Sequence, residues 1–290
     1  MSLLSRWLTA TSGVLTVAAV TFGRRRLTSM PAEADEPVVS PLDEIRSRLL
    51  AAEADVRLGG LRDWVAFGEG RVENRQPALD VLCEALRELP WPGTEVDRRW
   101  RSVLQATLTA RLRPGPGFWL DSDVDLRCTT LTDFDLSGCR LRHARFEGTR
   151  FRGDTRFDHT TFLGAFVADG AFFGRHVLFT RSVFARGLGL RGVALCGNGE
   201  LSHIHVAGPA VFSGARVSGR ADFGCARFGS ELDCSGVRFG GRAVFRRAWF
   251  AGASSFQGAW FRGREDFVDA VFGGDSSFEN TRFGHRVHAD

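Results

Sequence analysis

The chain has 290 residues, of which 43% are hydrophobic and 25% are charged, a composition typical of a globular protein. Its 38 basic residues are all arginine and exceed the 34 acids only slightly, so that the small formal net charge of +4 argues against a general nucleic-acid-binding protein. The absence of lysine excludes a phosphate-loop lysine and a Schiff-base lysine. The sequence also lacks a nucleophile elbow and a zinc-protease motif, and we therefore expect neither an enzyme nor a cofactor.

Residues 1–26 contain a candidate membrane anchor. Residues 7–23 carry no charge, Arg6 precedes them, and the larger cluster Arg24 to Arg26 follows. The positive-inside rule then predicts a single-pass protein with its N-terminus outside and the rest of the chain in the cytoplasm. The segment is slightly short for a span. Two alternatives stay open, an apolar N-terminal helix or untranslated sequence before a true start at Met30, which would make the protein cytoplasmic.

Residues 27–40 form a linker, because they hold two prolines and several acids without periodicity. Residues 41–113 are predicted to form a helical module. Ser40 and Pro41 give an N-cap followed by a proline at the first helical position, and Gly59-Gly60 is expected to interrupt the helical pattern. Pro77 is expected to open another helix.

A second capping box, Thr94 to Asp97, begins the last predicted helix, and the run from Arg113 to Gly117 closes the module. Trp64 and Trp100 are expected in its core.

Beyond this module, apolar residues recur at alternating spacings of five and six to the end of the chain. Upstream of Phe151 the spacing is a plain five, through Leu126, Leu131, Leu136, Leu141 and Phe146. Such a fixed short period indicates a repeat architecture. One series in steps of eleven is Phe151, Phe162, Phe173, Phe184, Leu195, Val206, Val217, Phe228, Phe239, Phe250, Phe261, Phe272 and Phe283. The other is Phe157, Ala168, Phe179, Leu190, Leu201, Phe212, Phe223, Cys234, Phe245, Phe256, Phe267 and Phe278.

Neither the helical period of 3.6 nor the strand period of 2 fits this spacing, whereas a solenoid with one inward apolar centre per unit does. The residue two before each centre is usually small and is expected to share the interior. Glycine often follows two after a centre, where a tight corner would need unusual backbone angles. Examples of these glycines are Gly153, Gly164, Gly214, Gly219, Gly252, Gly258 and Gly263.

These runs, among them Ala144 to Gly148 and Ala259 to Gly263, resemble the pentapeptide-repeat family over about residues 118–290. The phenylalanine-rich form is similar to the actinobacterial variant, and parts of the helical module are similar to the helical region that precedes such repeats in membrane-associated members. The resemblance implies an α+β multi-domain protein with a right-handed quadrilateral β-helix of four units per coil. A coil would then take about 22 residues, and residue n would stack on residue n+22.

With this stacking, arginines line up on the predicted outer surface and form a candidate partner-binding ridge. The opposite corner would instead carry Pro209, Glu231, Ala253 and Asp275. An exposed tryptophan between arginines can bind by stacking and cation–π contact, while Asp222 and Asp266 could offset the repulsion between the arginines. A solvated ridge with local ion pairs is the alternative. The ridge comprises one line, Arg220, Arg242, Arg264 and Arg286, and a second, Arg216, Arg238, Trp260 and Arg282.

Two further sets of residues, a pair of histidines with one cysteine and the cysteines as a whole, contain side chains that could bind metal or form disulfides. His203, His205 and Cys225 could meet as soft metal ligands, but no fourth ligand is evident and solvated side chains are the simpler interpretation, so no metal site is assigned. The cysteines form no CxxC motif, which favours a reducing compartment without disulfides, and Cys139 and Cys234 are expected to point inward as small hydrophobes.

The sequence therefore predicts a non-enzymatic scaffold for protein interaction, tethered to the cytoplasmic face of the membrane. Its partner would be an acidic protein surface or lie at the membrane surface, with no direct contact to nucleic acid. The alternative is a topoisomerase-interacting protein that mimics duplex DNA, a mechanism that needs an acidic face. An uncapped last coil would expose strand edges, which predicts a possible homodimer through the C-terminal coil.

Overall fold

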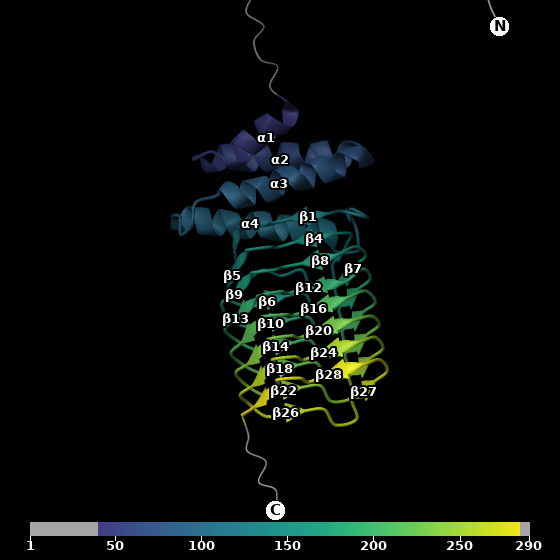
Figure 1. Ribbon diagram of the computed structural model, residues 1–290. Coiled ribbons are helices and arrows are strands. Elements are labelled where there is room, and N and C mark those ends of the chain that lie inside the picture. The colour runs from purple at the N-terminus through teal and green to yellow at the C-terminus, as the bar shows by residue number, and fades with distance from the viewer. Residues whose placement is uncertain (1–39, 285–290) are drawn as a thin grey trace, which may run out of the picture. The chain divides into compact units, whose positions relative to one another are not determined.

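The computed structural model describes residues 40–284, which form four helices followed by a parallel β-solenoid (Figure 1). The predicted anchor, the linker up to residue 39 and Arg286 lie outside the described residues. Within residues 40–284, every helix is too short or too polar to cross a membrane. The predicted combination of a small helical module and a quadrilateral β-helix is confirmed.

The helical module begins and ends near the predicted residues. Its helices are α1 (Pro41–Leu49), α2 (Ala54–Gly70), α3 (Arg75–Glu88) and α4 (Glu95–Leu112), with a short 3-10 helix η1 (Val72–Asn74) before α3. The Ser40 hydroxyl accepts a hydrogen bond from the Leu42 N–H, and Thr94 and Asp97 form the expected reciprocal capping box at α4. The two capping sequences therefore mark the first residues of α1 and α4 correctly.

The expected break at Gly59-Gly60 was wrong, because α2 runs through both glycines and the chain turns at residues 50–53 instead. The glycines serve the packing of α1 on α2. A Cβ atom added to Gly60 would lie 2.8 Å from the Cβ atom of Arg48, so only glycine lets the two helices approach this closely. Helix propensity is thus overridden by a tertiary contact.

Trp64 and Trp100 lie in the core of the module, as expected. Trp64 is fully buried and its indole N–H donates to the Ala78 carbonyl at 2.6 Å, while the Trp100 indole donates to the Leu49 carbonyl at 2.9 Å. Each ring therefore fills core volume and also satisfies a backbone group.

The solenoid consists of four parallel sheets, named A to D in the order in which the chain visits them. Sheet A holds β1 (Val124–Asp125), β4 (Ala144–Arg145), β8 (Phe166–Val167), β12 (Leu188–Gly189), β16 (Ala210–Val211), β20 (Leu232–Asp233), β24 (Ser254–Ser255) and β28 (Ser276–Ser277). Sheet B holds β2 (Thr130–Thr132), β5 (Arg150–Arg152), β9 (Phe172–Phe173), β13 (Ala194–Leu195), β17 (Arg216–Val217), β21 (Arg238–Phe239), β25 (Trp260–Phe261) and β29 (Arg282–Phe283).

Sheets C and D complete each coil. Sheet C holds β6 (Thr155–Arg156), β10 (Val177–Leu178), β14 (Gly199–Glu200), β18 (Ala221–Asp222), β22 (Ala243–Val244) and β26 (Glu265–Asp266). Sheet D holds β3 (Arg140–Leu141), β7 (Thr161–Phe162), β11 (Val183–Phe184), β15 (His205–Val206), β19 (Arg227–Phe228), β23 (Trp249–Phe250) and β27 (Val271–Phe272).

The register between coils follows the spacing of the apolar centres. Where the spacing is five, the first coil is shorter: Val124 pairs with Ala144, which is 20 residues later. From Ala144 onward the partner lies 22 residues later, as in the pairing of Ala144 with Phe166. The rule that residue n stacks on residue n+22 is therefore confirmed for the phenylalanine-rich coils.

The core is built from stacked side chains of successive coils. Phe151 and Phe173 stack with ring centroids 4.6 Å apart, and Phe256 and Phe278 with centroids 4.9 Å apart. The small residues two before the centres share this interior, since Thr149, Thr160 and Ser182 are fully buried. Each of these hydroxyls donates to a backbone carbonyl of the preceding coil, which satisfies the buried polar group.

The expected reason for the corner glycines, an unusual backbone angle, holds for only some of them. Gly214 and Gly258 do have a positive φ, but Gly252 and Gly263 do not. At Gly263 an added Cβ atom would lie 2.3 Å from the Gly241 carbonyl oxygen of the preceding coil, so closeness of the coils demands glycine there. Conversely, left-handed positions between sheets C and D carry side chains, as at Arg181 and His203.

Helix α4 closes the N-terminal end of the solenoid. Three of its side chains and that of its C-cap residue, each four residues apart, donate hydrogen bonds to backbone carbonyls of the first coil that face away from the second. They are Arg101 to Thr130, Gln105 to Thr132, Thr109 to Asp135 and Arg113 to Ser137, at 2.7–3.0 Å. The helix therefore replaces a missing coil, and the strand edges at this end are protected.

The opposite end differs. Phe278 and Phe283, which occupy core positions, are 36% and 47% exposed, and β26 to β29 pair with one neighbouring strand each among the described residues. Within residues 40–284 this end has no counterpart of α4.

Removal of one capping side chain should destabilise the fold. In Gln105→Ala, the Thr132 N–H and carbonyl lose the partners that Gln105 supplies at 3.3 and 2.8 Å. A buried group left without a partner costs about 1–3 kcal/mol. We expect a loss of at least about 2 kcal/mol in urea unfolding followed by circular dichroism. The exposed Gln257→Ala is the matched control, and equal midpoints for the two variants would show that the cap contributes nothing.

Thiol labelling should sort the six free cysteines by burial. Burial raises the pKa of Cys83 and of Cys139 to about 12 and also raises the pKa of Cys234, so these three thiols are protonated at pH 8. We expect rapid reaction with a disulfide reagent at exposed Cys128 and Cys196, slower reaction at Cys225, and six reactive thiols only after unfolding. Cys196→Ser should remove one fast equivalent; four or more fast thiols in the native chain would contradict the packing.

Candidate functional site

The predicted line through Trp260 is a real column on the outer face of sheet B. Arg216 pairs with Arg238, Arg238 with Trp260, and Trp260 with Arg282 on successive strands. All four side chains are exposed, Trp260 to 41%. The alternation of outward and inward residues along each strand explains this, because their neighbours Phe239 and Phe261 fill the core.

The other predicted line stands at the next corner, between sheets B and C. The Ala221 N–H donates to the Arg242 carbonyl and the Ala243 N–H to the Arg264 carbonyl, which places Arg220, Arg242 and Arg264 on three successive coils. We call these three residues the arginine corner. Since each follows a sheet B arginine or tryptophan by four residues, the two lines border one another, which the sequence alone did not establish.

Two aspartates on sheet C partly neutralise the arginine corner, as expected. Arg220 pairs with Asp222 at 2.6 Å, and Arg242 and Arg246 both pair with Asp266, at 2.9 and 3.1 Å. Burial acts to raise the pKa of Asp266, but the Val268 N–H and the two guanidinium groups together hold it below its usual value. The aspartate therefore stays charged and reduces repulsion between coils.

The structure adds members to this face that the sequence analysis did not select. Arg150 and Phe172 pair on the outer face of sheet B, and Arg152 and Arg262 follow the inward centres of their strands. Phe172 is 40% exposed. The 22-residue rule, extended upstream from Arg216 through Ala194, would have found both Phe172 and Arg150.

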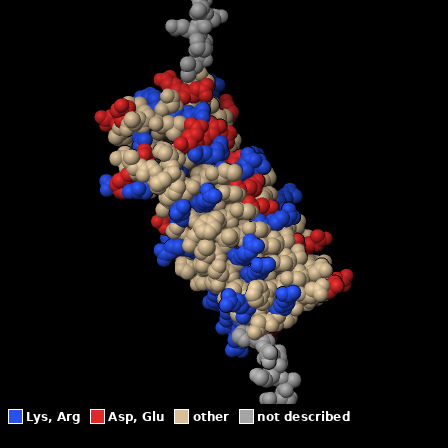
Figure 2. All heavy atoms as spheres, turned by 60° about the vertical axis from the view of Figure 1, so that its left-hand side comes forward, with Lys and Arg blue, Asp and Glu red and all other residues tan. Residues whose placement is uncertain are grey.

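Together these residues make one arginine-rich face, which comprises the outer side of sheet B and the arginine corner. None of the outward positions of β2 to β29 on sheet B is an acid in the described residues. Figure 2 looks toward this side and shows arginines spread over the repeat part of the molecule, with few carboxylates among them. An extended cationic face with two exposed aromatic side chains can dock an anionic surface.

The diagonally opposite corner, between sheets D and A, has the residues expected there. Backbone hydrogen bonds to the carbonyls of Glu231, Ala253 and Asp275 come from the preceding coil in each case. Glu231 and Asp275 are exposed. The solenoid therefore has a cationic corner and an anionic corner on opposite sides.

His203, His205 and Cys225 do border one surface groove, together with Arg227 and Arg247. Both histidines are exposed. Among residues 40–284, however, no three His, Cys, Asp or Glu side chains are arranged to hold a metal ion. The arrangement thus gives no support to the soft-metal hypothesis.

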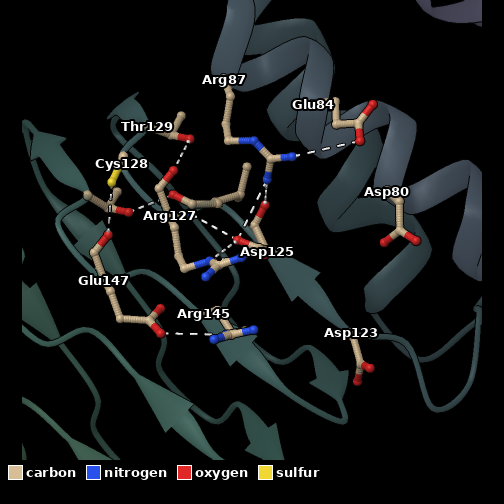
Figure 3. A network of polar contacts seen from close by, with 12 residues as sticks. Asp80, Glu84, Arg87, Asp123, Asp125, Arg127, Cys128, Thr129, Arg145 and Glu147 are labelled. Atoms are coloured by element: carbon tan, nitrogen blue, oxygen red, sulfur yellow. Dashed lines mark hydrogen bonds and ion pairs between the residues drawn. The ribbon is translucent and has the colours of Figure 1, made fainter.

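A cluster of acids at the seam between α3 and the first coil is tied to arginines (Figure 3). Asp125 pairs with Arg127 at 2.6 Å, mainly through a hydrogen bond that lowers its pKa, and the Arg87 guanidinium donates to the Asp125 carbonyl at 2.6 Å. Burial raises the pKa of nearby Asp80, whose carboxylate accepts from Gln76 at 2.8 Å. Of these contacts, the one from Arg87 to Asp125 joins the module to the solenoid.

The interior offers little space for a ligand. Where Leu195 and Val217 replace phenylalanine in the sheet B stack, an apolar cavity of about 30 Å³ remains. That volume is close to the room one water molecule needs. The larger depressions of the described residues are open grooves on the surface.

Comparison with known families agrees with this geometry. A model of eight pentapeptide repeats matches residues 122–153, and a model of nine pentapeptide repeats matches residues 201–249. Both segments lie in the solenoid and show the stacked coils described above. The chain is therefore a pentapeptide-repeat protein. No curated protein matches it.

The asymmetry of charge should be measurable by cation-exchange chromatography at pH 7. We expect Arg216→Gln, Arg238→Gln to elute at lower salt than Arg191→Gln, Arg227→Gln, although both variants lose two positive charges. The reason is that the first pair borders other arginines on one face, whereas Arg191 lies near Asp169 and Arg227 is on sheet D. Identical elution of the two variants would show that the face does not act as a unit.

Proposed function

We propose that this pentapeptide-repeat protein is a non-enzymatic scaffold whose arginine-rich face docks an acidic surface of a partner protein. The observation that carries the proposal is the outer side of sheet B, which has no outward acid among the described residues. There exposed Trp260 lies between Arg238 and Arg282, and exposed Phe172 pairs with Arg150. Tryptophan and arginine are the residues that most often dominate protein interfaces. A rigid solenoid holds them in place without loss of main-chain freedom.

A protein partner suits this face better than an anionic lipid surface. Aromatic rings flanked by guanidinium groups recognise shaped apolar and acidic features together, whereas lipid headgroups need only net charge. Several of the arginines are also held by Asp222 and Asp266. Binding to anionic vesicles is therefore the competing outcome.

The DNA-mimic alternative receives no support from the outward positions. It requires a continuous acidic face, but sheet A places Arg145 between Asp125 and Asp233 and ends in Ser255 and Ser277. On sheet C, Asp222 and Asp266 are paired with arginines. We also propose that the protein does not bind nucleic acid directly. Several arginines that could contact phosphate groups are already paired with aspartates.

Two parts of the proposal concern assembly and location. We propose that residues 7–23 hold the protein at the membrane with its repeats in the cytoplasm, supported by the uncharged segment and the arginines at 24–26. We also keep the C-terminal coil as a candidate for self-pairing, supported by the exposure of Phe278 and Phe283.

The proposed function is tested by crosslinking and affinity capture from host cells with the full-length chain. We expect Arg242→Glu, Arg264→Glu to lose the acidic partners that the native chain captures, because reversal of two charges creates repulsion. The control Arg191→Glu, Arg227→Glu changes the net charge equally away from the face.

The same experiment records the compartment. The native chain is expected in the membrane fraction, and removal of residues 1–26 should release it. If the native chain and the Arg242→Glu, Arg264→Glu variant capture the same proteins, the arginine-rich face is solvated surface only. If the native chain binds anionic vesicles and captures no protein, the partner is a lipid surface.

A further inference from the structure

The corner between sheets D and A forms a groove lined by carboxylates and small side chains. The groove measures about 310 Å³, and Glu231, Asp233 and Asp275 line it together with alanine and serine residues. Neither Glu231 nor Asp275 forms an ion pair within residues 40–284. We call this surface the acidic groove.

Glycines at this corner leave its backbone without projecting side chains at two positions. Gly252 precedes Ala253, and Gly274 precedes Asp275. An added Cβ atom at Gly252 would lie 2.7 Å from the Ser230 carbonyl carbon, and one at Gly274 would lie 2.6 Å from the Gly252 carbonyl carbon. Larger residues cannot stand at these positions, so the backbone stays open to a long side chain from outside.

The arginine corner has the complementary shape and charge. Its three long side chains project from successive coils, and those of Arg220 and Arg242 are 45% and 55% exposed even while they contact their aspartates. Each guanidinium carries five N–H donors, so the contact with one carboxylate leaves donors for another. A ridge of arginine on one corner thus matches a groove of acid on the opposite one.

The spacing of the two corners also agrees. Arg220 and Arg264 are two coils apart, and so are Glu231 and Asp275. Strand spacing makes both separations about 9.6 Å. When two copies lie side by side with parallel axes, Arg220 can oppose Glu231 and Arg264 can oppose Asp275, while Arg242 faces the small Ala253. A partner helix, which repeats every 5.4 Å, would drift out of step with the coils.

We propose that a second copy of this chain docks its arginine corner into the acidic groove. This inference rests on the proposed function, since it uses part of the arginine-rich face and names one of its partners. The contact is heterologous, because two different corners meet, and it leaves one free arginine corner and one free groove in every dimer. Copies can therefore add sideways into rows. Exposed ion pairs are weak and screened by salt, so association is concentration-dependent and is lost at high ionic strength.

The test is sedimentation velocity on the full-length chain in a non-ionic detergent, at low and at high salt. Two variants are compared: Arg220→Gln, Arg264→Gln removes the two arginines that are proposed to meet acids, and Glu231→Gln, Asp275→Gln removes the two acids that they meet. We expect the native chain to form growing species at low salt that revert to monomer at high salt. Each variant alone should remain monomeric, because it lacks one of the two surfaces.

An equimolar mixture of the two variants is the decisive measurement. Each variant retains the surface that the other lacks, so the mixture should give one-to-one dimers that grow no further. Association of either variant like the native chain, or a mixture that behaves as its separate components, would overturn the proposal. A dimer that persists in both variants and in high salt would place self-pairing at the C-terminal coil instead.

A charge exchange guards against misfolding. Arg220→Glu, Arg264→Glu combined in one chain with Glu231→Arg, Asp275→Arg should restore salt-sensitive growth, which a merely unfolded chain would not do. The Glu231→Gln, Asp275→Gln variant should still capture the acidic partners of the proposed function. A native chain that captures its acidic partners but does not self-associate would overturn only this inference. A native chain that self-associates but captures no acidic partner specifically would overturn only the proposed partner binding.

Discussion

The structure depends on the hydrogen bonding of each coil to the next. Strands of two or three residues cannot be stable alone, so their backbone groups must find partners on the neighbouring coil. That requirement fixes the 22-residue register, and the register in turn stacks the phenylalanine centres at about the spacing of the strands. It also creates a problem at both ends, because the terminal coils have strand edges without a neighbouring coil.

The two ends of the described chain treat this problem differently. At the N-terminal end, a row of polar side chains on α4 donates hydrogen bonds to backbone carbonyls of the first coil. These side chains, Arg101, Gln105 and Thr109, are buried, although buried positions are usually apolar. Their burial is tolerated because each side chain is hydrogen-bonded. The helical module is thus a cap that is continuous with the solenoid. Its presence covers the strand edges at the N-terminal end of the solenoid.

The same register determines the electrostatics. Any residue type that recurs at 22 becomes a column, so a small excess of arginine over acid in the composition is concentrated on sheet B and its corner. Repulsion along the column is relieved where Asp222 and Asp266 stand beside it. The acidic groove arises by the same rule on the opposite corner. A nearly neutral protein thereby acquires two strongly different sides, on which both proposals depend.

The sequence by itself determined the solenoid, its coil length and the two arginine lines, because a period that never slips leaves only one way to bury all the centres. It also determined the starts of α1 and α4, since capping is a local interaction. Tertiary structure decided the rest. Gly59-Gly60 lies inside α2 because packing against α1 outweighs propensity. The corner glycines are required because the adjacent coil lies so close. The α4 cap depends on contacts between residues that are distant in the chain.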